Sequence, residues 1–469
     1  MNVSLRKIEY VFFQLFLALI TIVYINFITV RYNNDFFRKL CIFATMMSLL
    51  ILVVQVKYEK GFIKPFVIVL VCFELFQIGL PMLYAIDKTY TNWNMEFFDL
   101  KNRIESLTFT LYCIHAFAIG GCIGITGEKK KKDIGKKFLE NPNLNRKIAM
   151  ILSIATGIVA IPLAAMITAL SMKYGYNYIK VDSMGINSGF TNAVRTIFPA
   201  SIFLLLVYSK SKIEKKIVLT IIVIYGSLSM AAGGRTVGLS IFLVLIYYYT
   251  TNGEKKQKNK LLRIIVTAML IMALITVLVF VRNMRMGEDM SKFNIITIVE
   301  SVIEEMGFNF TSICFTKKYI PQFMDYSMGK SYINAIVCLI PSSLDPMGIV
   351  DACKQASPEQ WLAVQLHRSY GTTFDYGVGY SVVAESFYNF GNFGYFIVFI
   401  QGYFIQRILS IDFVGNSKFS LYIKLIMIWA LTTYPRRSFY TLEKALEYDV
   451  LLVMLTIWIV YSIARRRRK

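Results

Sequence analysis

The sequence predicts an all-α integral membrane protein with about 12 transmembrane helices, because apolar runs of about 18–22 residues recur along the whole chain. Two further observations support this fold class. Of the 469 residues, 56% are hydrophobic, whereas soluble domains average about 45–50%. The mean hydropathy is +0.53. A chain of this kind requires a bilayer as its solvent.

The expected spans follow one another with short connections over the first part of the chain. The first run is too long for a signal peptide and has no small-residue cleavage site, so we interpret it as a span. The predicted spans are residues 10–30, 41–56, 65–86, 106–126, 148–170, 197–209, 217–232, 236–250, 264–281, 382–406, 419–433 and 449–464.

Basic residues concentrate in alternate loops, which predicts the orientation. Lys and Arg outnumber Asp and Glu by 51 to 29, for a formal net charge of +22. Lys and Arg near span ends favour the cytoplasmic side, so we place both termini there. The charge is therefore a topology signal and does not indicate nucleic-acid binding. The basic clusters are residues 57–64, 129–147, 210–216, 255–263 and 465–469.

This orientation places the longest loop outside and divides the chain into three parts. Residues 1–281 hold about nine spans, residues 282–381 form a large external loop, and residues 382–469 hold the last three spans and a basic cytoplasmic C-terminus. Acidic and basic residues nearly balance in the loop, as is typical of a folded functional domain. Its apolar stretch 332–340 is too short to span and predicts a short interfacial or re-entrant helix.

Metal and cofactor chemistry find no support in the sequence. The seven cysteines form no CxxC pair, and the two histidines, His115 and His367, belong to no Cys/His cluster. Cys314, Cys338 and Cys353 share the external loop, and their spacing leaves open whether one disulfide forms there. We therefore expect no metal site and no cofactor.

Glu385 is the leading candidate for a catalytic carboxylate. Ionisable groups at membrane depth are costly and usually face a cavity or a partner. Glu385 lies about one turn into the predicted span 382–406, after small residues that include Gly377 and Gly379. Small residues allow close approach of a ligand or another helix. For Glu74, in the span 65–86, a structural role and a site role both stay open.

Arg235 is the leading candidate for binding a phosphate group. It follows Gly233 and Gly234 in a predicted outer hairpin between two short spans, and short spans indicate helices broken around a cavity. The planar guanidinium binds two phosphate oxygens at once. A lipid-headgroup contact is the alternative. Other outer-face arginines that would add to a cationic surface are Arg282, Arg285, Arg368, Arg436 and Arg437.

Three motifs resemble those of the Wzy-type O-antigen and capsule repeat-unit polymerases, which are related to the O-antigen ligases. Arg235 to Leu239, after Gly-Gly, resembles the Arg-x3-Leu pattern. Arg368 to Gly379 matches an Arg-x10-Gly pattern of a periplasmic loop. The Ala-Glu-Ser-Phe-Tyr-Asn-Phe-Gly sequence around Glu385 resembles the segment after the large outer loop. The order of these motifs covers nearly the whole chain.

The resemblance implies a glycosyltransferase of the bacterial plasma (inner) membrane. The donor would be a growing glycan on undecaprenyl pyrophosphate, and the acceptor the non-reducing end of an incoming lipid-linked repeat unit, joined with inversion and without metal. Arg235 and Arg368 would bind the pyrophosphate, and the neighbouring arginines Arg282, Arg285 and Arg436 would add to its site. The general base would be Glu385, with Asp375 and His367 in reserve. A chain-length regulator and a flippase are expected partners.

Three other functions compete with this hypothesis. A lipid-linked oligosaccharide flippase has similar spans but usually two related halves, and we find no internal repeat. An O-antigen ligase would carry a His-x10-Gly pattern, but Val378 stands eleven places after His367. A non-catalytic scaffold would need neither Glu385 nor the Gly-Gly-Arg sequence. The sugars, the linkage and the kind of polysaccharide are not encoded in these motifs.

Overall fold

The described part of the computed structural model is helical and falls into two compact units. Within it, α-helices and short 3-10 helices occur and strands do not, in agreement with the predicted all-α class. Each unit is described by itself. The structure describes residues 3–27, 32–125, 142–174, 189–232, 235–252, 295–340, 345, 347–370, 379–410, 417–440 and 450–466.

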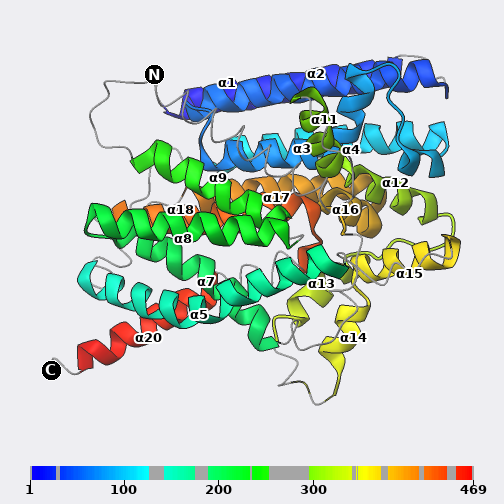
Figure 1. Ribbon diagram of the computed structural model, residues 1–469. Helices are drawn as coiled ribbons and strands as arrows, with labels where there is room; N and C mark the ends of the chain where they lie inside the picture. Colours follow the sequence, from blue (N-terminus) through cyan, green and yellow to red (C-terminus); the bar gives the residue numbers. More distant parts are fainter. Residues whose placement is uncertain are drawn as a thin grey trace. The chain divides into compact units, whose positions relative to one another are not determined.

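The first unit, which comprises residues 1–129, 299–410 and 434–443, is built on long helices. α1 packs on α4, α2 packs on α3 and α4, and α17 packs along α4. Figure 1 shows α1 and α2 in blue, with α3 and α4 beside them. The long helices of this unit are α1 (Val3–Phe27), α2 (Asn34–Glu59), α3 (Pro65–Ile86), α4 (Leu100–Gly124) and α17 (Gly394–Leu409).

Glycines allow α4 and α17 to touch backbone to backbone. A Cβ atom at Gly402 of α17 would collide with the carbonyl oxygen of Phe117, and one at Gly120 of α4 would collide with the carbonyl oxygen of Phe399. Small residues at such crossings are typical of helix pairs in membranes, where close packing replaces the hydrophobic effect as the source of association.

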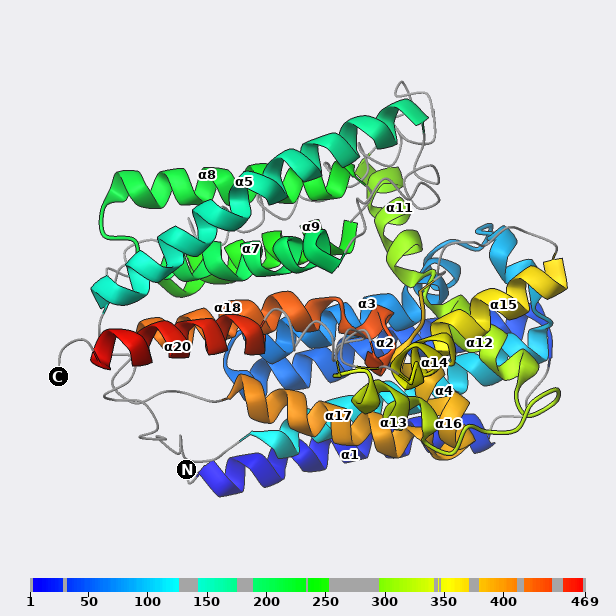
Figure 2. The same ribbon diagram turned by 90° about the horizontal axis from the view of Figure 1, so that it is seen from below.

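The short helices α12 (Phe310–Tyr319) and α15 (Pro358–Tyr370) lie at one end of these long helices in both views (Figures 1 and 2). Lys318 donates to the carbonyl oxygen of Phe97 over 3.1 Å, and Asn102 donates to that of Cys314 over 3.1 Å. α12 therefore shares an end with the α3–α4 connection, which the charge pattern predicts to be outside. The short helices are η1 (Trp93–Phe97), in that connection, and, in the external loop, α11 (Ile295–Gly307), α12, α13 (Lys330–Val337), α14 (Ile349–Gln355) and α15.

The predicted continuous span 382–406 is wrong, because the chain breaks there into two helices. α16 (Val382–Phe390) ends at Gly391, whose φ of +57° favours glycine. A single 3-10 turn, η4 (Gly391–Phe393), then leads into α17. Gly394 lies directly against the backbone of Ser386, so a side chain there would prevent the tight reversal. The helix expected near 332–340 does form, as α13.

The second unit comprises residues 130–298, 411–433 and 444–469. α5 packs on α7 and α8, α8 packs on α9, and α18 packs on α7 and α9. Figure 1 draws α5, α7, α8 and α9 of this unit in turquoise to green, and α20 in red. Its helices are α5 (Pro142–Tyr174), α7 (Gly189–Tyr208), α8 (Lys212–Ala231), α9 (Arg235–Asn252), α18 (Ser417–Thr432) and α20 (Leu452–Arg466).

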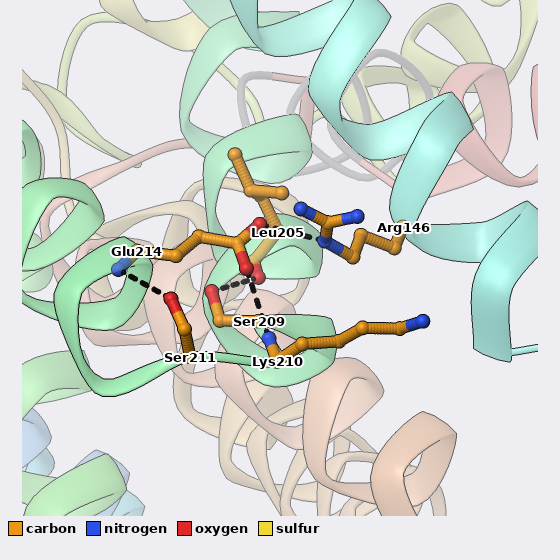
Figure 3. A network of polar contacts seen from close by, with 6 residues as sticks. All are labelled: Arg146, Leu205, Ser209, Lys210, Ser211 and Glu214. Carbon is orange, nitrogen blue, oxygen red and sulfur yellow. Dashed lines mark hydrogen bonds and ion pairs between the residues drawn. The ribbon is translucent and has the colours of Figure 1, made fainter.

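A polar network fixes the turn between α7 and α8 (Figure 3). Ser211 caps α8 by accepting from the backbone N–H of Glu214 over 3.0 Å. The Glu214 carboxylate accepts from the Lys210 backbone N–H at 2.9 Å and from Arg146 of α5 at 2.7 Å. Burial alone would raise the pKa of Glu214, but these hydrogen bonds and the Arg146 charge lower it.

Five of the described helices are long and apolar enough to cross a membrane. Residues 193–208 and 237–251 form shorter apolar helices. The predicted span 264–281 lies outside the described residues. The total of about 12 spans and the cytoplasmic termini therefore stay predictions. The five long candidates are Lys7–Phe27, Asn34–Glu59, Pro65–Ile86, Leu100–Gly124 and Pro142–Lys173.

Candidate functional site

The start of α16 forms the centre of the candidate site in the first unit. Ser381 caps the helix by accepting from the N–H groups of Val383 and Ala384, and it donates to Gln77 of α3 over 2.6 Å. Gly379, with a φ of +76°, turns the chain into this cap. The Tyr380 hydroxyl pairs with that of Thr316 over 2.8 Å. From Gly379 onward, where the description resumes, the small-residue segment singled out in the sequence is thus held in place by hydrogen bonds.

Glu385 lies one turn into α16 and is only 1% exposed. One carboxylate oxygen accepts from the hydroxyl of Ser331 at 2.7 Å, and the other accepts from the backbone N–H of Phe439 at 2.6 Å. Among the described residues, no Lys, Arg or His forms an ion pair with it. The carboxylate therefore joins three parts of the chain: the start of α13, α16 itself and the segment after η5 (Tyr434–Arg436).

Asn389 extends this network one helical turn further. Its amide donates to the Ser331 hydroxyl over 2.7 Å and to the carbonyl oxygen of Glu385 over 2.8 Å. Its side-chain oxygen accepts from the N–H of Gly329 at 3.0 Å. Because buried polar groups are costly unless hydrogen-bonded, this complete pairing indicates a rigid connection between α13 and α16.

The segment 434–439 carries two adjacent arginines and is fixed on both sides of them. Gln77 and Asn309 both donate to the carbonyl oxygen of Pro435, over 2.8 and 3.0 Å. Glu359 of α15 accepts from the backbone N–H and the hydroxyl of Ser438, both at 3.0 Å. We call residues 434–439 the arginine segment. Arg436 and Arg437 within it are half-buried.

Gly379 brings the turn before α16 next to the arginine segment. A Cβ atom at Gly379 would lie 3.7 Å from the Arg436 Nε atom and 3.8 Å from its carbonyl oxygen. The structure therefore places Arg436 and Glu385, both predicted site residues, beside the same short stretch of backbone, although they are 51 positions apart in the sequence. A guanidinium beside a helix start is an arrangement suited to an anion.

A buried lysine that the sequence interpretation missed lies on another side of α16. Lys317 of α12 has its ammonium 4.6 Å from the ring centre of Phe387 and 3.9 Å from the Glu105 carboxylate. Burial lowers the pKa of Lys317. Through this cation–π contact, Lys317 packs against α16 within the same unit.

The other predicted site residues are distributed differently. Arg235 is the first residue of α9, in the second unit. His367 and Arg368 are exposed in the last turn of α15, the helix that carries Glu359. The remaining candidates, Arg282, Arg285 and Asp375, lie outside the described residues. The structure thus brings together Glu385 and Arg436 but provides no description of the Arg235 side chain.

Sequence reasoning missed the residues that hold the arginine segment. Gln77 and Asn309 are buried amides, and Glu359 is a half-buried carboxylate. A signal for Gln77 was present, because a glutamine in an otherwise apolar span needs a partner. Asn389 was also detectable, since it stands four positions after Glu385 and therefore on the same helix face. Asn309 and Glu359 carry no such signal in the sequence.

Metal-binding groups and disulfides do not occur in the described part of the structure. Within it, no three His, Cys, Asp or Glu side chains gather as metal ligands. Cys314, Cys338 and Cys353 form no disulfide in this structure, so the bridge left open by their shared loop is absent among them. Glu74 is buried in α3, and one of its oxygens has no hydrogen-bond partner among the described residues.

Comparison with known proteins identifies the family. The family model for the O-antigen polysaccharide polymerase Wzy matches residues 10–468, nearly the whole chain. No curated protein and no solved structure matches significantly. The family is that of a glycosyltransferase-type polymerase, in agreement with the resemblance seen in the motifs and with the apolar helices of a membrane protein. The chain belongs to the O-antigen polysaccharide polymerase Wzy family.

Proposed function

We propose that the protein lengthens a polysaccharide by transferring a growing glycan from undecaprenyl pyrophosphate to the non-reducing end of an incoming lipid-linked repeat unit. The reaction takes place at the outer face of the bacterial plasma membrane, in the synthesis of O-antigen, capsule or exopolysaccharide. Membership of the Wzy family supports a polymerase in general. The positive-inside pattern supports the outer face, because it places the helices of the external loop on that side.

The observation that carries this proposal is the fixed arginine segment beside the start of α16. The leaving group of the reaction is a pyrophosphate, on which negative charge develops. Fixed cations in a partly dehydrated site stabilise such charge without reorganising. Arg436, with its Nε atom 3.7 Å from the Cβ position of Gly379, lies in a segment held on both sides. Arg235, Arg368, Arg282 and Arg285 are further candidates for contacts with the pyrophosphate.

The proposed chemistry is a direct inverting displacement without metal. The acceptor hydroxyl attacks the anomeric carbon of the donor glycan from the face opposite the pyrophosphate. The bond between that carbon and the pyrophosphate oxygen breaks, and undecaprenyl pyrophosphate leaves with the electron pair. A general base takes the hydroxyl proton; the candidates are Glu385, His367 and Asp375. Such a base typically contributes about 10²–10⁴-fold.

Deletion of the gene for this chain in its producing cells tests the function. We expect the cells to keep single repeat units on their surface and to lose long chains, because export is a separate activity. Accumulation of lipid-linked units on the cytoplasmic side, with none outside, would instead identify a flippase. Long chains that remain on the lipid carrier and fail to reach their final acceptor would identify a ligase. Re-expression of the chain is the control.

A further inference from the structure

Two carboxylates from different helices bind adjacent positions of one short backbone segment. Glu359 of α15 accepts from the Ser438 N–H at 3.0 Å, and Glu385 of α16 accepts from the Phe439 N–H at 2.6 Å. On the other side of the two arginines, the carbonyl oxygen of Pro435 accepts from two amides. The backbone of residues 436 and 437 is thereby fixed at both ends.

It requires an explanation that a buried carboxylate, Glu385, fixes the backbone of the arginine segment. Glu385 is 1% exposed, and burying a carboxylate costs several kcal/mol unless hydrogen bonds compensate. Both of its oxygens already accept hydrogen bonds from protein groups, the Ser331 hydroxyl and the Phe439 N–H. Each oxygen keeps a further lone pair, but a sugar hydroxyl could reach this side chain, which is 1% exposed, only if the helices around it moved. Charge-assisted hydrogen bonds are about twice as strong as neutral ones, which suits an anchor.

We propose that Glu385 and Glu359 are positioning residues, which hold the arginine segment so that Arg436 and Arg437 face the pyrophosphate of the lipid donor. This inference rests on the proposed function and leaves His367 and Asp375 as the candidates for its general base. The two carboxylates act through the backbone of Ser438 and Phe439 and do not touch the substrate. Their effect is preorganisation: the cations are held in place before charge develops, and a misplacement of about 1 Å can cost about 10²-fold in rate.

Glutamine substitution separates positioning from general base catalysis. In Glu385→Gln, the amide oxygen still accepts from Phe439 and the amide NH₂ donates to the Ser331 hydroxyl, so the anchor persists while the base is lost. In Glu385→Ala, both are lost. The corresponding glutamine and alanine variants of the second carboxylate are Glu359→Gln and Glu359→Ala. Glu59→Ala is the matched control, because the half-buried Glu59 accepts from Gln406 over 2.8 Å and does not bind the arginine segment.

The experiment measures two properties of the purified variants. The first is binding of undecaprenyl pyrophosphate to the protein in detergent, and the second is chain growth from undecaprenyl-pyrophosphate-linked repeat units. We expect both alanine variants to bind the lipid at least tenfold more weakly and to lose about 10²-fold in chain growth. Both glutamine variants should stay within about tenfold of the wild type, the difference between charge-assisted and neutral hydrogen bonds. Glu59→Ala should match the wild type in both.

A different pattern would overturn the proposal. If Glu385→Gln binds the lipid normally but is as inactive as Glu385→Ala, Glu385 is the general base. If lipid binding is unchanged in all four variants, the carboxylates do not position a pyrophosphate site. These outcomes differ from failure of the proposed function, in which the wild-type protein itself would form no chains from lipid-linked repeat units.

Discussion

The two units of the chain bury different kinds of polar side chain. In the described part of the first unit, the buried polar side chains include carboxylates and amides, among them Glu74, Gln77, Asn309, Glu385 and Asn389. In the described part of the second unit, the buried polar side chains are hydroxyls of Ser and Thr, with Asn145 as the one amide.

These polar groups also bind different partners. In the second unit, hydroxyls join neighbouring helices: Thr432 donates to the Ser240 hydroxyl over 2.8 Å, and Thr168 donates to the carbonyl oxygen of Leu228 over 3.0 Å. In the first unit, Gln77 and Glu385 bind backbone groups more than 50 positions away. Amides and carboxylates at membrane depth are costly and usually functional. The comparison indicates that the first unit holds the prepared site, and the following predictions test it.

The largest effect is expected at Arg235, a residue of the second unit. If Arg235 binds the donor pyrophosphate, Arg235→Ala should reduce chain growth about 10²–10³-fold, enough to remove long chains from cells. Arg235→Lys should also be strongly impaired, because lysine lacks the bidentate fork. The measurement is the length distribution of surface polysaccharide, at matched protein levels. Normal long chains in Arg235→Ala would make this arginine a lipid-headgroup anchor and leave the first unit as the location of the donor cations.

The next effect concerns stability and compares glycines of the two units. Gly402→Ala should destabilise the first unit by about 1–3 kcal/mol, because the added methyl group collides with backbone at Phe117, which cannot move alone. Gly226→Ala in the second unit should cost less, since its nearest neighbour is the Ile241 side chain at 3.2 Å. Thermal unfolding in detergent, followed by size-exclusion chromatography, measures both. Equal losses would mean that the backbone contact between α4 and α17 is not a stability determinant.

A smaller effect is expected at the Arg146–Glu214 pair of the second unit. The two side chains are 30% and 18% exposed, so Arg146→Ala should cost no more than about 1 kcal/mol. Because the folded-state pKa of Glu214 is lowered, the contribution of the pair is present above the unfolded pKa and is lost as pH falls through the folded value. Thermal unfolding of wild type and Arg146→Ala should therefore converge in acid. A difference that persists at low pH would contradict this.

No effect is expected from chelation. Polymerisation by the purified protein should survive EDTA, because the proposed mechanism uses arginine charges where other enzymes use a divalent ion. The measurement is product length with and without chelator. Loss of activity that Mg²⁺ or Mn²⁺ restores would show that the mechanism is wrong and that ligands for the ion exist.

The sequence predicted the fold better than the site. Apolar periodicity located α1 to α5 to within about eight residues at each end, because spans of this length are set by the bilayer. It failed at 382–406, where Gly391 and Gly394 reverse the chain although the hydropathy stays high. Hydropathy does not register a positive φ.

At the site, composition pointed to Glu385 but not to its partners. A carboxylate in an apolar run is visible in one sequence, whereas the residues that bind it depend on tertiary contacts. The N–H of Phe439 and the hydroxyl of Ser331 lie 54 positions away on either side of it, and Glu359 gives no local signal. Arg436 was predicted from orientation alone, as one of several outer arginines, and only the structure distinguishes it by its fixed backbone.

Chain growth by the purified protein in liposomes tests the central claim most directly. Wild type, Arg436→Ala and Arg436→Lys are reconstituted with undecaprenyl-pyrophosphate-linked repeat units, and the products are separated by length. We predict a ladder of lengthening glycans and free undecaprenyl pyrophosphate with the wild type, a loss of about 10²–10³-fold with Arg436→Ala, and a strong impairment with Arg436→Lys. Units that cross the bilayer without being joined, or an undiminished ladder with Arg436→Ala, would contradict it.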